Sequence, residues 1–204
     1  VVVCGGGNNG GDGYVVARLA RQVGFDARVL AVAEPGALRG DAQTAWQDAQ
    51  AVETPISPFH ASSLDKADLI VDALLGTGLE REVSGLWQEA IAAINASASD
   101  TLALDVPSGL HADTGVILGA AIQAAATITF VGLKQGLLTG QGPACCGEVR
   151  FADLGVPPDL YTALHPACWR YAGDDLASWL PRRSRSTHKG NFGHVLVVGG
   201  DLGM

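Results

Sequence analysis

The 204-residue sequence has no long apolar run. A membrane-spanning helix needs roughly 18 or more consecutive apolar residues, and the most apolar stretch, residues 119–133, is interrupted by Gln123 and several threonines. The sequence also shows no secretory signal, with its basic start, apolar middle and small-residue cleavage site. We therefore expect a cytoplasmic protein with no membrane partner, and we assign residues 119–133 to the core.

The sequence is also poor in basic residues and in cysteine. Lys and Arg together number 13 against 21 Asp and Glu, which gives a formal net charge of −8. A nucleic-acid partner requires a basic surface, so this charge argues against one. The 4 cysteines form no C-x-x-C pair and no nearby histidine completes a zinc-binding pattern, which excludes a typical zinc site. Small buried thiols in a reducing compartment are the simplest interpretation.

What the sequence does contain is a regular alternation of strand-like and helix-like segments. The expected strands are residues 1–4, 27–33, 67–73, 101–106, 125–131 and 147–151, and the expected helices are 11–23, 41–51 and 87–96. The apolar face of the first helix is expected to consist of Val15, Val16, Leu19 and Val23. Such alternation predicts an α/β fold: a doubly wound, mostly parallel Rossmann-like three-layer sandwich. Ligands of these sheets bind at the carboxyl ends of the strands, where the strand order reverses.

The first of these strand ends is the stretch CGGGNNGGDG at residues 4–13. Gly5, Gly7 and Gly10 fit the spacing G-x-G-x-x-G, whose backbone amides and helix start bind a pyrophosphate in dinucleotide enzymes. Glu34 follows the second expected strand, where a ribose-binding acid belongs. This pattern favours a dinucleotide ligand but does not by itself identify a dehydrogenase.

The other polar residues of the same stretch leave two interpretations open. Asp12 either caps the helix or faces the ligand, where its carboxylate competes with a pyrophosphate for the amides. Asn8 and Asn9 either tolerate a left-handed backbone or offer neutral oxygen ligands to a cation or to sugar hydroxyls. Two adjacent asparagines among so many glycines favour the second interpretation.

Two later strands also end in polar turns. Asp72 ends the apolar strand before LLGTGLERE, and Asp105 ends the strand before VPSG, which contains Ser108. A carboxylate is costly to bury unless it is paired, so each acid is either bonded to loop amides or part of a site. Because carboxyl ends of parallel strands share one edge of the sheet, we expect Asp72, Asp105, Ser108 and Asn9 to converge there.

Further polar groups follow these strand ends. The segment Gly76-Thr77-Gly78 offers backbone amides to an anion. Arg81 either binds a phosphate or pairs with its acidic neighbours Glu80 and Glu82. Lys134, after the strand ITFV, either faces solvent or contacts a phosphate.

Taken in order, the motifs CGGGNNGGDG, VDALLGTGLER, LDVPSG and TFVGLKQGL make the chain resemble the NAD(P)H-hydrate epimerase family. The resemblance implies that the chain interconverts the R and S forms of NAD(P)H-hydrate and uses a potassium ion. It implies substrate contacts at Asn8, Asn9, Gly10, Gly11, Asp12, Gly76, Thr77, Gly78, Leu79, Glu80, Arg81, Glu82 and Asp105, to which we add Lys134. It implies potassium ligands at Asn9, Asp72 and Ser108, and Asp105 is our candidate for the catalytic acid and base.

The tail HKGNFGHVLVVGGDLGM resembles the opening of a ribokinase-like NAD(P)H-hydrate dehydratase domain. We therefore expect an epimerase domain at residues 1–173, a linker at 174–194 and the first strand of a truncated dehydratase domain at 195–204. The expected parent chain is bifunctional, with an ADP- or ATP-dependent dehydratase activity that this fragment lacks. We also expect a homo-oligomer.

Two other function classes remain as alternatives. A Rossmann dehydrogenase needs a catalytic acid–base pair such as Tyr-x-x-x-Lys, and no tyrosine of this sequence has that spacing. A non-catalytic interaction module is expected to lose the acidic site residues, whereas Asp72, Asp105 and Ser108 are all present. Epimerisation is therefore the leading hypothesis.

Overall fold

A computed structural model describes residues 1–171, 173–175, 186, 188, 190 and 196. The chain forms two compact units, Val1–His165 and Pro166–Met204. The sheet and the α-helices that cover it belong to the first unit. The expected linker and the expected strand at 195–204 fall almost entirely outside the described residues, so both stay predictions.

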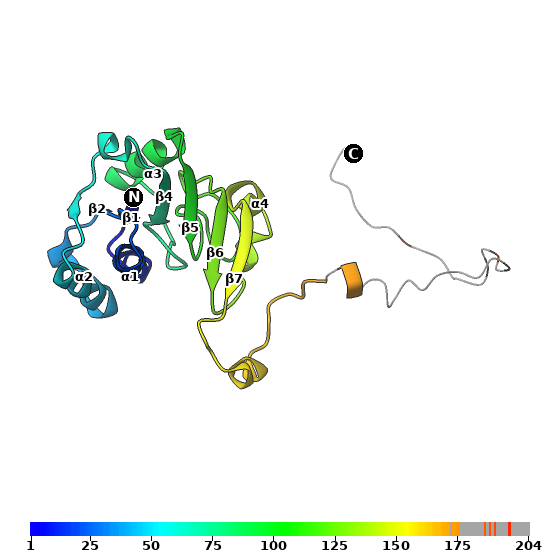
Figure 1. Cartoon of the computed structure of the whole chain (residues 1–204). Helices are drawn as coiled ribbons and strands as arrows, with labels where there is room; N and C mark the ends of the chain where they lie inside the picture. Colours follow the sequence, from blue (N-terminus) through cyan, green and yellow to red (C-terminus); the bar gives the residue numbers. More distant parts are fainter. Residues whose placement is uncertain (172, 176–185, 187, 189, 191–195, 197–204) are drawn as a thin grey trace. The chain divides into compact units, whose positions relative to one another are not determined.

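The first unit is built from alternating strands and helices (Figure 1). Its strands are β1 (Val2–Cys4), β2 (Val29–Ala31), β3 (Ile56–Pro58), β4 (Leu69–Ala73), β5 (Asp100–Leu104), β6 (Ala126–Phe130) and β7 (Glu148–Ala152). Its α-helices are α1 (Asn8–Gln22), α2 (Gly40–Ala51), α3 (Leu86–Ala96) and the short α4 (Gly142–Cys145). Short 3₁₀ turns lie at Pro35–Ala37, Ala61–Leu64, Gln135–Leu137 and Pro158–Ala163.

Within the described residues the strands form one seven-stranded sheet in the order β3-β2-β1-β4-β5-β6-β7. Every neighbouring pair is parallel, with Val3 of β1, for example, beside Leu30 of β2 and Asp72 of β4. The order runs outward from β1 to β3 and then restarts on the other side of β1, so it reverses between β1 and β4. This arrangement confirms the doubly wound α/β sandwich.

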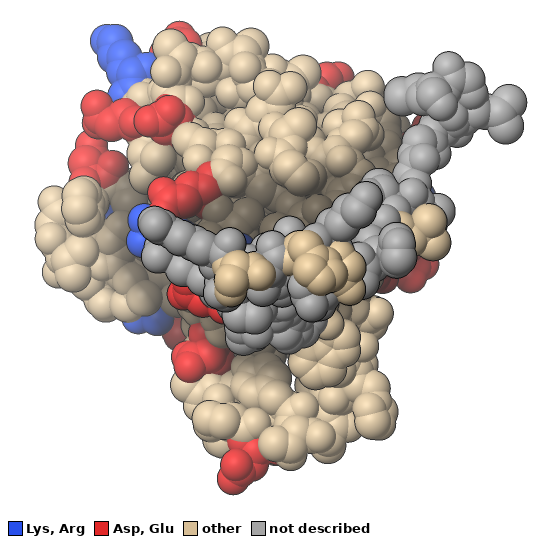
Figure 2. Space-filling view, turned by 90° about the vertical axis from the view of Figure 1, so that its right-hand side faces the viewer, with Lys and Arg blue, Asp and Glu red and all other residues tan. Residues whose placement is uncertain are grey.

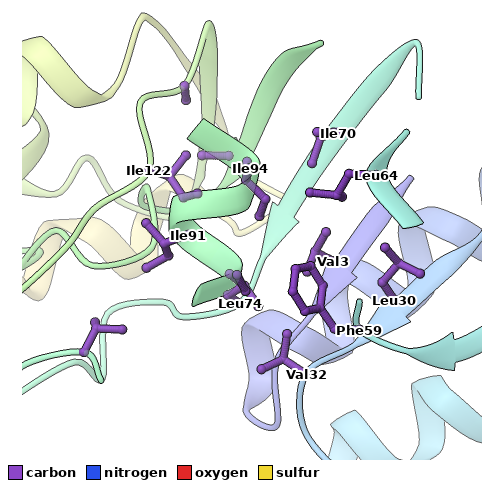
Figure 3. Close-up of a cluster of buried hydrophobic side chains, with 14 of the residues drawn as sticks. Val3, Leu30, Val32, Phe59, Leu64, Ile70, Leu74, Ile91, Ile94 and Ile122 are labelled. Atoms are coloured by element: carbon purple, nitrogen blue, oxygen red, sulfur yellow. The ribbon is translucent and has the colours of Figure 1, made fainter. Parts of the chain in front are cut away.

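The alternation of side chains along the strands builds the two outer layers. On one face Val3, Leu30 and Ile70 pack against Ile91 and Ile94 of α3 (Figure 3). On the other face the neighbouring strand positions pack against α1 and α2, through Val2, Cys4, Val29, Val71, Tyr14, Ala17, Ala42, Ala45 and Ala49. Because both faces of the central strands are covered, these strands are apolar without interruption, as parallel strands usually are.

The apolar face predicted for the first helix is confirmed at Val15 and Val16, which are partly buried against the core, and is wrong at Leu19 and Val23. Leu19 and Val23 are 46% and 74% exposed, whereas Gly10, Gly13 and Ala17 are buried. A Cβ atom added to Gly13 would lie 2.5 Å from the Cβ of Ala73, so α1 packs on the sheet through a stripe of small residues. Close packing of the helix on the strands therefore outweighs the burial of its larger side chains.

Two further expectations need correction. Residues 56–58, which lie outside the expected strands, form β3, and Pro58 is tolerated there because β3 is an edge strand, where a missing backbone donor costs little. Cys168 is exposed, while Cys4, Cys145 and Cys146 are the buried free thiols that we expected.

The surface carries mainly acidic charge. Figure 2 shows more acidic than basic side chains on one face of the molecule, in keeping with the formal net charge of −8. In the part of the chain that the structure describes, no helix has both the length and the apolar character needed to cross a membrane.

Candidate active site

A cavity of about 400 Å³ lies at the carboxyl edge of the sheet, where the strand order reverses. It is enclosed by the loop after β1, the first turns of α1, the loop after β4 and the first residue after β5. The lining residues are Gly7, Asn8, Asn9, Asp12, Leu74, Leu75, Gly76, Thr77, Gly78, Leu79 and Asp105. The structure thus brings together three of the strand ends that the sequence singled out.

Asp72 and Ser108 form a fully buried pair beneath this cavity. The Ser108 hydroxyl lies 2.6 Å from Oδ1 of Asp72 and donates to it, and the Ser108 amide donates to Oδ2 at 2.8 Å. The amide of Leu74 also donates to Oδ1, at 3.1 Å. These bonds join the loop after β5 to the end of β4. The segments that carry Asp105 and Asp72 are therefore fixed relative to each other.

Asn9 presents an unpartnered oxygen to the same region. Its Nδ2 donates to the carbonyl of Leu75 at 3.0 Å, while its side chain is only 8% exposed and its Oδ1 is buried without a hydrogen-bond partner. The Leu75 amide in turn donates to Oγ of Ser108 at 2.8 Å. A buried acceptor without a donor is costly, and a bound cation would satisfy it.

A left-handed backbone, the alternative role of the two asparagines, is found at neither, since both belong to helix α1. Oxygen atoms of an amide, a carboxylate and a hydroxyl instead belong to one hydrogen-bonded cluster, in which the Leu75 carbonyl accepts from Asn9 and Ser108 and Ser108 also donates to Asp72. Hard, mostly neutral oxygen ligands of this kind suit an alkali or alkaline-earth cation better than a transition metal. The residues present thus fit the potassium ion implied by the resemblance.

Burial gives Asp72 an unusual pKa. Loss of hydration raises its pKa from 3.8 to about 6, and the hydrogen bonds from Ser108 and Leu74 oppose part of this rise. The folded chain then binds a proton more tightly than the unfolded chain does. Its free energy of unfolding therefore falls as the pH rises through this window.

We predict that Asp72→Asn removes this pH dependence. In buffer without metal cations, wild-type stability should fall by up to about 3 kcal/mol between about pH 4 and pH 6, since the pKa differs by about two units. Urea denaturation of both proteins across this range measures the two slopes. Equal slopes would mean that Asp72 does not titrate as its burial requires.

Asp105 occupies a strained position directly after β5. Its φ of 66° lies in the left-handed region, which an Asp or Asn tolerates better than most residues. Its amide donates to the carbonyl of Ile128 at 2.7 Å, and its Oδ1 accepts from the Phe130 amide at 3.2 Å. Backbone strain of this kind is concentrated at functional sites, because the surrounding structure must hold it in place.

Lys134 is neither solvent-facing nor a lining residue of the cavity. Its ammonium group forms a half-buried salt bridge with Oδ1 of Asp105 and also donates to the carbonyl of Phe130 at 2.7 Å. Among the described residues no hydrogen bond reaches Oδ2 of Asp105. Lys134 therefore fixes the carboxylate through one oxygen and leaves the other available to a ligand in the cavity.

Asp12 lines the cavity and does not cap the helix. The N-cap of α1 is Gly7, which makes no side-chain bond, and Asp12 lies in the second turn. Partial burial, and then the nearby carboxylate of Asp105, raise the pKa of Asp12. Two carboxyl groups with different surroundings therefore face one space, an arrangement typical of acid–base pairs.

The remaining predicted site residues are divided between two cavities. Gly76, Thr77, Gly78 and Leu79 line the large cavity with Asn8, while Gly10 and Gly11 are buried in α1 and do not line it. Arg81 and Glu82 line a second cavity of about 330 Å³ with Leu75, Leu79, Val83, Ser84 and Trp87. Glu80 is exposed and lines neither.

Sequence reasoning missed the backbone part of the site. The carbonyl and amide of Leu75 connect Asn9 to Ser108, and nothing in the identity of a leucine indicates this role. The salt bridge between Lys134 and Asp105 was also not foreseen. The position of Lys134 just past the strand beside β5 is the one signal that could have indicated it.

Comparison with known proteins identifies the family of this chain. The family described as YjeF-related protein N-terminus matches residues 1–136. The bifunctional NAD(P)H-hydrate repair enzyme Nnr of Coxiella burnetii is 44% identical over 203 residues, which cover 100% of this chain and 42% of that protein. The Escherichia coli enzyme of the same name is 41% identical over 209 residues, covering 100% of this chain and 39% of its own length.

The chain thus spans about two fifths of the length of these relatives. A crystal structure of the yeast protein ynu0 shares the fold, with a TM-score of 0.67 and 20% identity over 83% of this chain and 73% of that one. The match contains every predicted site residue, from Asn8 to Lys134, and the chain belongs to the family of YjeF-related protein N-terminal domains.

Proposed function

We propose that this chain is an NAD(P)H-hydrate epimerase, an isomerase that interconverts the R and S forms of hydrated NADH or NADPH. One observation carries the proposal. Asp105 and Asp12 face a single cavity at the point where the strand order reverses, beside the buried Asn9, Asp72 and Ser108. The names of the relatives, which are NAD(P)H-hydrate repair enzymes, support the choice of substrate.

The chemistry requires proton transfers at two atoms of the substrate, the hydroxyl oxygen and the ring nitrogen. The reacting carbon carries a hydroxyl and adjoins the ring nitrogen. In ring opening, Asp105 accepts the hydroxyl proton, the carbon–nitrogen bond breaks to give a carbonyl, and the ring nitrogen takes up a proton. Closure on the opposite face of the carbonyl reverses these transfers and gives the other epimer. Loss and return of water achieves the same inversion, with a carboxyl group first donating a proton to the leaving hydroxyl.

The two carboxyl groups of the cavity suit these steps. Oδ2 of Asp105 is available to the substrate because Oδ1 is held by Lys134, Thr129 and the Phe130 amide. The raised pKa of Asp12 favours its protonated form, which makes it the better proton donor. Asp105 thus serves as the base and Asp12 as its partner acid.

We further propose that Asn9, Asp72 and Ser108 hold a potassium ion, with the Leu75 carbonyl as an additional oxygen. Such a cation would supply positive charge that balances Asp72 and the phosphates of the substrate. The unpartnered Oδ1 of Asn9 supports this assignment. Because its ligands lie in α1, around the end of β4 and in the loop after β5, the cation would hold these segments in fixed positions around the cavity.

Asn9→Ala is therefore expected to abolish a stabilisation by potassium. At a potassium concentration about ten times its dissociation constant, the wild-type chain should gain about 1.4 kcal/mol, or a Tm rise of about 3–6 °C. Thermal denaturation in potassium chloride and in choline chloride measures the difference. Asn8→Ala, at the exposed neighbouring residue, is the matched control and should keep the response. An Asn9→Ala protein that still responds would place the cation elsewhere.

The proposed activity is tested by incubating the wild-type chain with one purified hydrate epimer and separating the epimers by chromatography. Formation of the other epimer above the rate without protein is the expected result. A rate no higher than that control would overturn the proposal. Because these relatives are called bifunctional, we propose a second activity for the parent protein. That this activity is a lyase rests on the resemblance of the tail at residues 188–204, and a cytoplasmic location and a homo-oligomeric assembly stay predictions from the sequence.

A further inference from the structure

A smaller cavity of about 170 Å³ at the carboxyl ends of β2 and β3 has no role in the mechanism above. Its walls are mainly apolar, and its one charged group is Glu34. The lining residues are Ala31, Val32, Ala33, Glu34, Pro35, Ile56, Ser57, Pro58, Phe59 and Leu86. Val32 and Phe59, which are largely buried, lie at one end of the hydrophobic cluster shown in Figure 3. Flat apolar walls with one carboxylate suit an aromatic ring that carries a hydroxylated sugar.

The small cavity and the larger one are bordered by neighbouring stretches of backbone at the carboxyl edge of the sheet. Gly7 lines the larger cavity and Ala33 the smaller, and Gly6 lies between them. A Cβ atom on Gly6 would lie 3.0 Å from the Cβ of Ala33, so this glycine is packed directly beside the end of β2. A ligand that extends from one cavity to the other would therefore pass over the backbone of Gly6 and Gly7, which carries no side chains, at the start of α1.

The start of α1 provides what a pyrophosphate needs. Helix α1 has 15 residues, begins after Gly7 and has neither a side-chain cap nor an acid in its first turn. Its first amide groups have no partner within the helix, and the helix dipole adds positive partial charge. A path from the larger cavity to the Arg81 cavity crosses the apolar side chains of Leu75 and Leu79 instead.

We propose that the small cavity binds the adenosine half of the dinucleotide substrate, and that Glu34 accepts a hydrogen bond from the ribose 2′-hydroxyl. The proposal rests on the proposed function and deepens it. A 2′-phosphate at this position would meet the Glu34 carboxylate, and like charges in close contact are strongly unfavourable. Arg39, the nearby cation, does not line the cavity and donates to the carbonyls of Gly36 and Leu38. The chain therefore prefers NADH-hydrate to NADPH-hydrate.

The first test compares kcat/KM for the two hydrates. Wild type should favour NADH-hydrate by about tenfold or more, and Glu34→Gln should reduce this ratio to within about threefold, mainly by improving NADPH-hydrate. Glu53→Gln is the matched control, because Glu53 is exposed and precedes β3, at the end of that strand away from the cavity. A ratio that Glu34→Gln leaves unchanged would overturn the role of Glu34.

The second test asks which cavity holds the adenosine half. Ser57→Trp fills the small cavity and Ser84→Trp fills the Arg81 cavity, both from exposed positions. The hydrate of reduced nicotinamide mononucleotide lacks adenosine and serves as the second substrate. Ser57→Trp should raise KM for NADH-hydrate about tenfold and leave KM for the mononucleotide hydrate unchanged, since only the dinucleotide reaches the small cavity.

The outcomes separate this proposal from the function on which it rests. If Ser84→Trp alone raises KM for NADH-hydrate, or if Ser57→Trp affects both substrates equally, the assignment of the small cavity is wrong while the epimerase activity stands. If wild type epimerises none of the hydrates, the proposed function fails and the assignment fails with it.

Discussion

Asp105→Asn is expected to lower kcat for hydrate epimerisation about 10³-fold, because general acid–base catalysis typically contributes 10² to 10⁴ and an amide cannot exchange the proton. The fold should survive the change. Asn adopts the left-handed conformation of Asp105 as readily as Asp does, and its Oδ1 still accepts from Lys134 and the Phe130 amide.

Three measurements check this expectation together: kcat, KM and the free energy of unfolding from urea denaturation. KM should change little, because the neutral side chain keeps its place on the cavity wall. Asp113→Asn, at an exposed acid in the following loop, is the control and should retain wild-type kcat. An Asp105→Asn protein with more than about a tenth of wild-type kcat would exclude Asp105 as the base.

Gly5→Ala is expected to have a large effect on stability, a loss of about 3 kcal/mol or more in the free energy of unfolding. A Cβ atom at Gly5 would lie 1.9 Å from the carbonyl oxygen of Leu74 and 2.9 Å from the ring of Trp87. Since Gly5 also donates its amide to the carbonyl of Ala73 at 2.9 Å, the loops after β1 and β4 cannot separate without losing that bond.

Gly7→Ala is the matched control for this effect. Gly7 lies two residues away, has an extended φ of −99°, and a Cβ atom there would have no neighbour within 4 Å. The Gly7→Ala protein should differ from wild type by no more than about 0.5 kcal/mol in urea denaturation. Equal stabilities of the two variants would show that the loops after β1 and β4 are not packed backbone to backbone, and the geometry of the large cavity depends on that packing.

The parts of the site that the sequence predicts are those fixed by the sheet. Asp72 and Asp105 each end an apolar strand, and parallel strands place their carboxyl ends at one edge, so their convergence with Ser108 follows from the pattern. The fold class follows from the same alternation of strands and helices. Neither prediction depends on the path of a particular loop.

The parts that the sequence does not predict depend on local backbone paths. The contact of Lys134 with Asp105 exists because Asp105 adopts a left-handed conformation and the chain bends after β6, and no periodicity encodes either. Helix α1 begins at Asn8 because its glycines pack closely against β1 and β4, which overrides their low helix propensity. Asp12, which the sequence offers as a possible N-cap, therefore lies in the second turn of α1 and lines the cavity.

Approach to equilibrium from both sides is the most direct test of the central claim, that this cavity epimerises NAD(P)H-hydrate. The wild-type chain is incubated with pure R epimer and, separately, with pure S epimer, in potassium chloride and in choline chloride, and the epimers are quantified over time. The account predicts that both reactions converge on one R-to-S ratio, faster than without protein, and that choline slows both. Conversion of only one epimer, formation of a different product, or no acceleration over the protein-free reaction would contradict it.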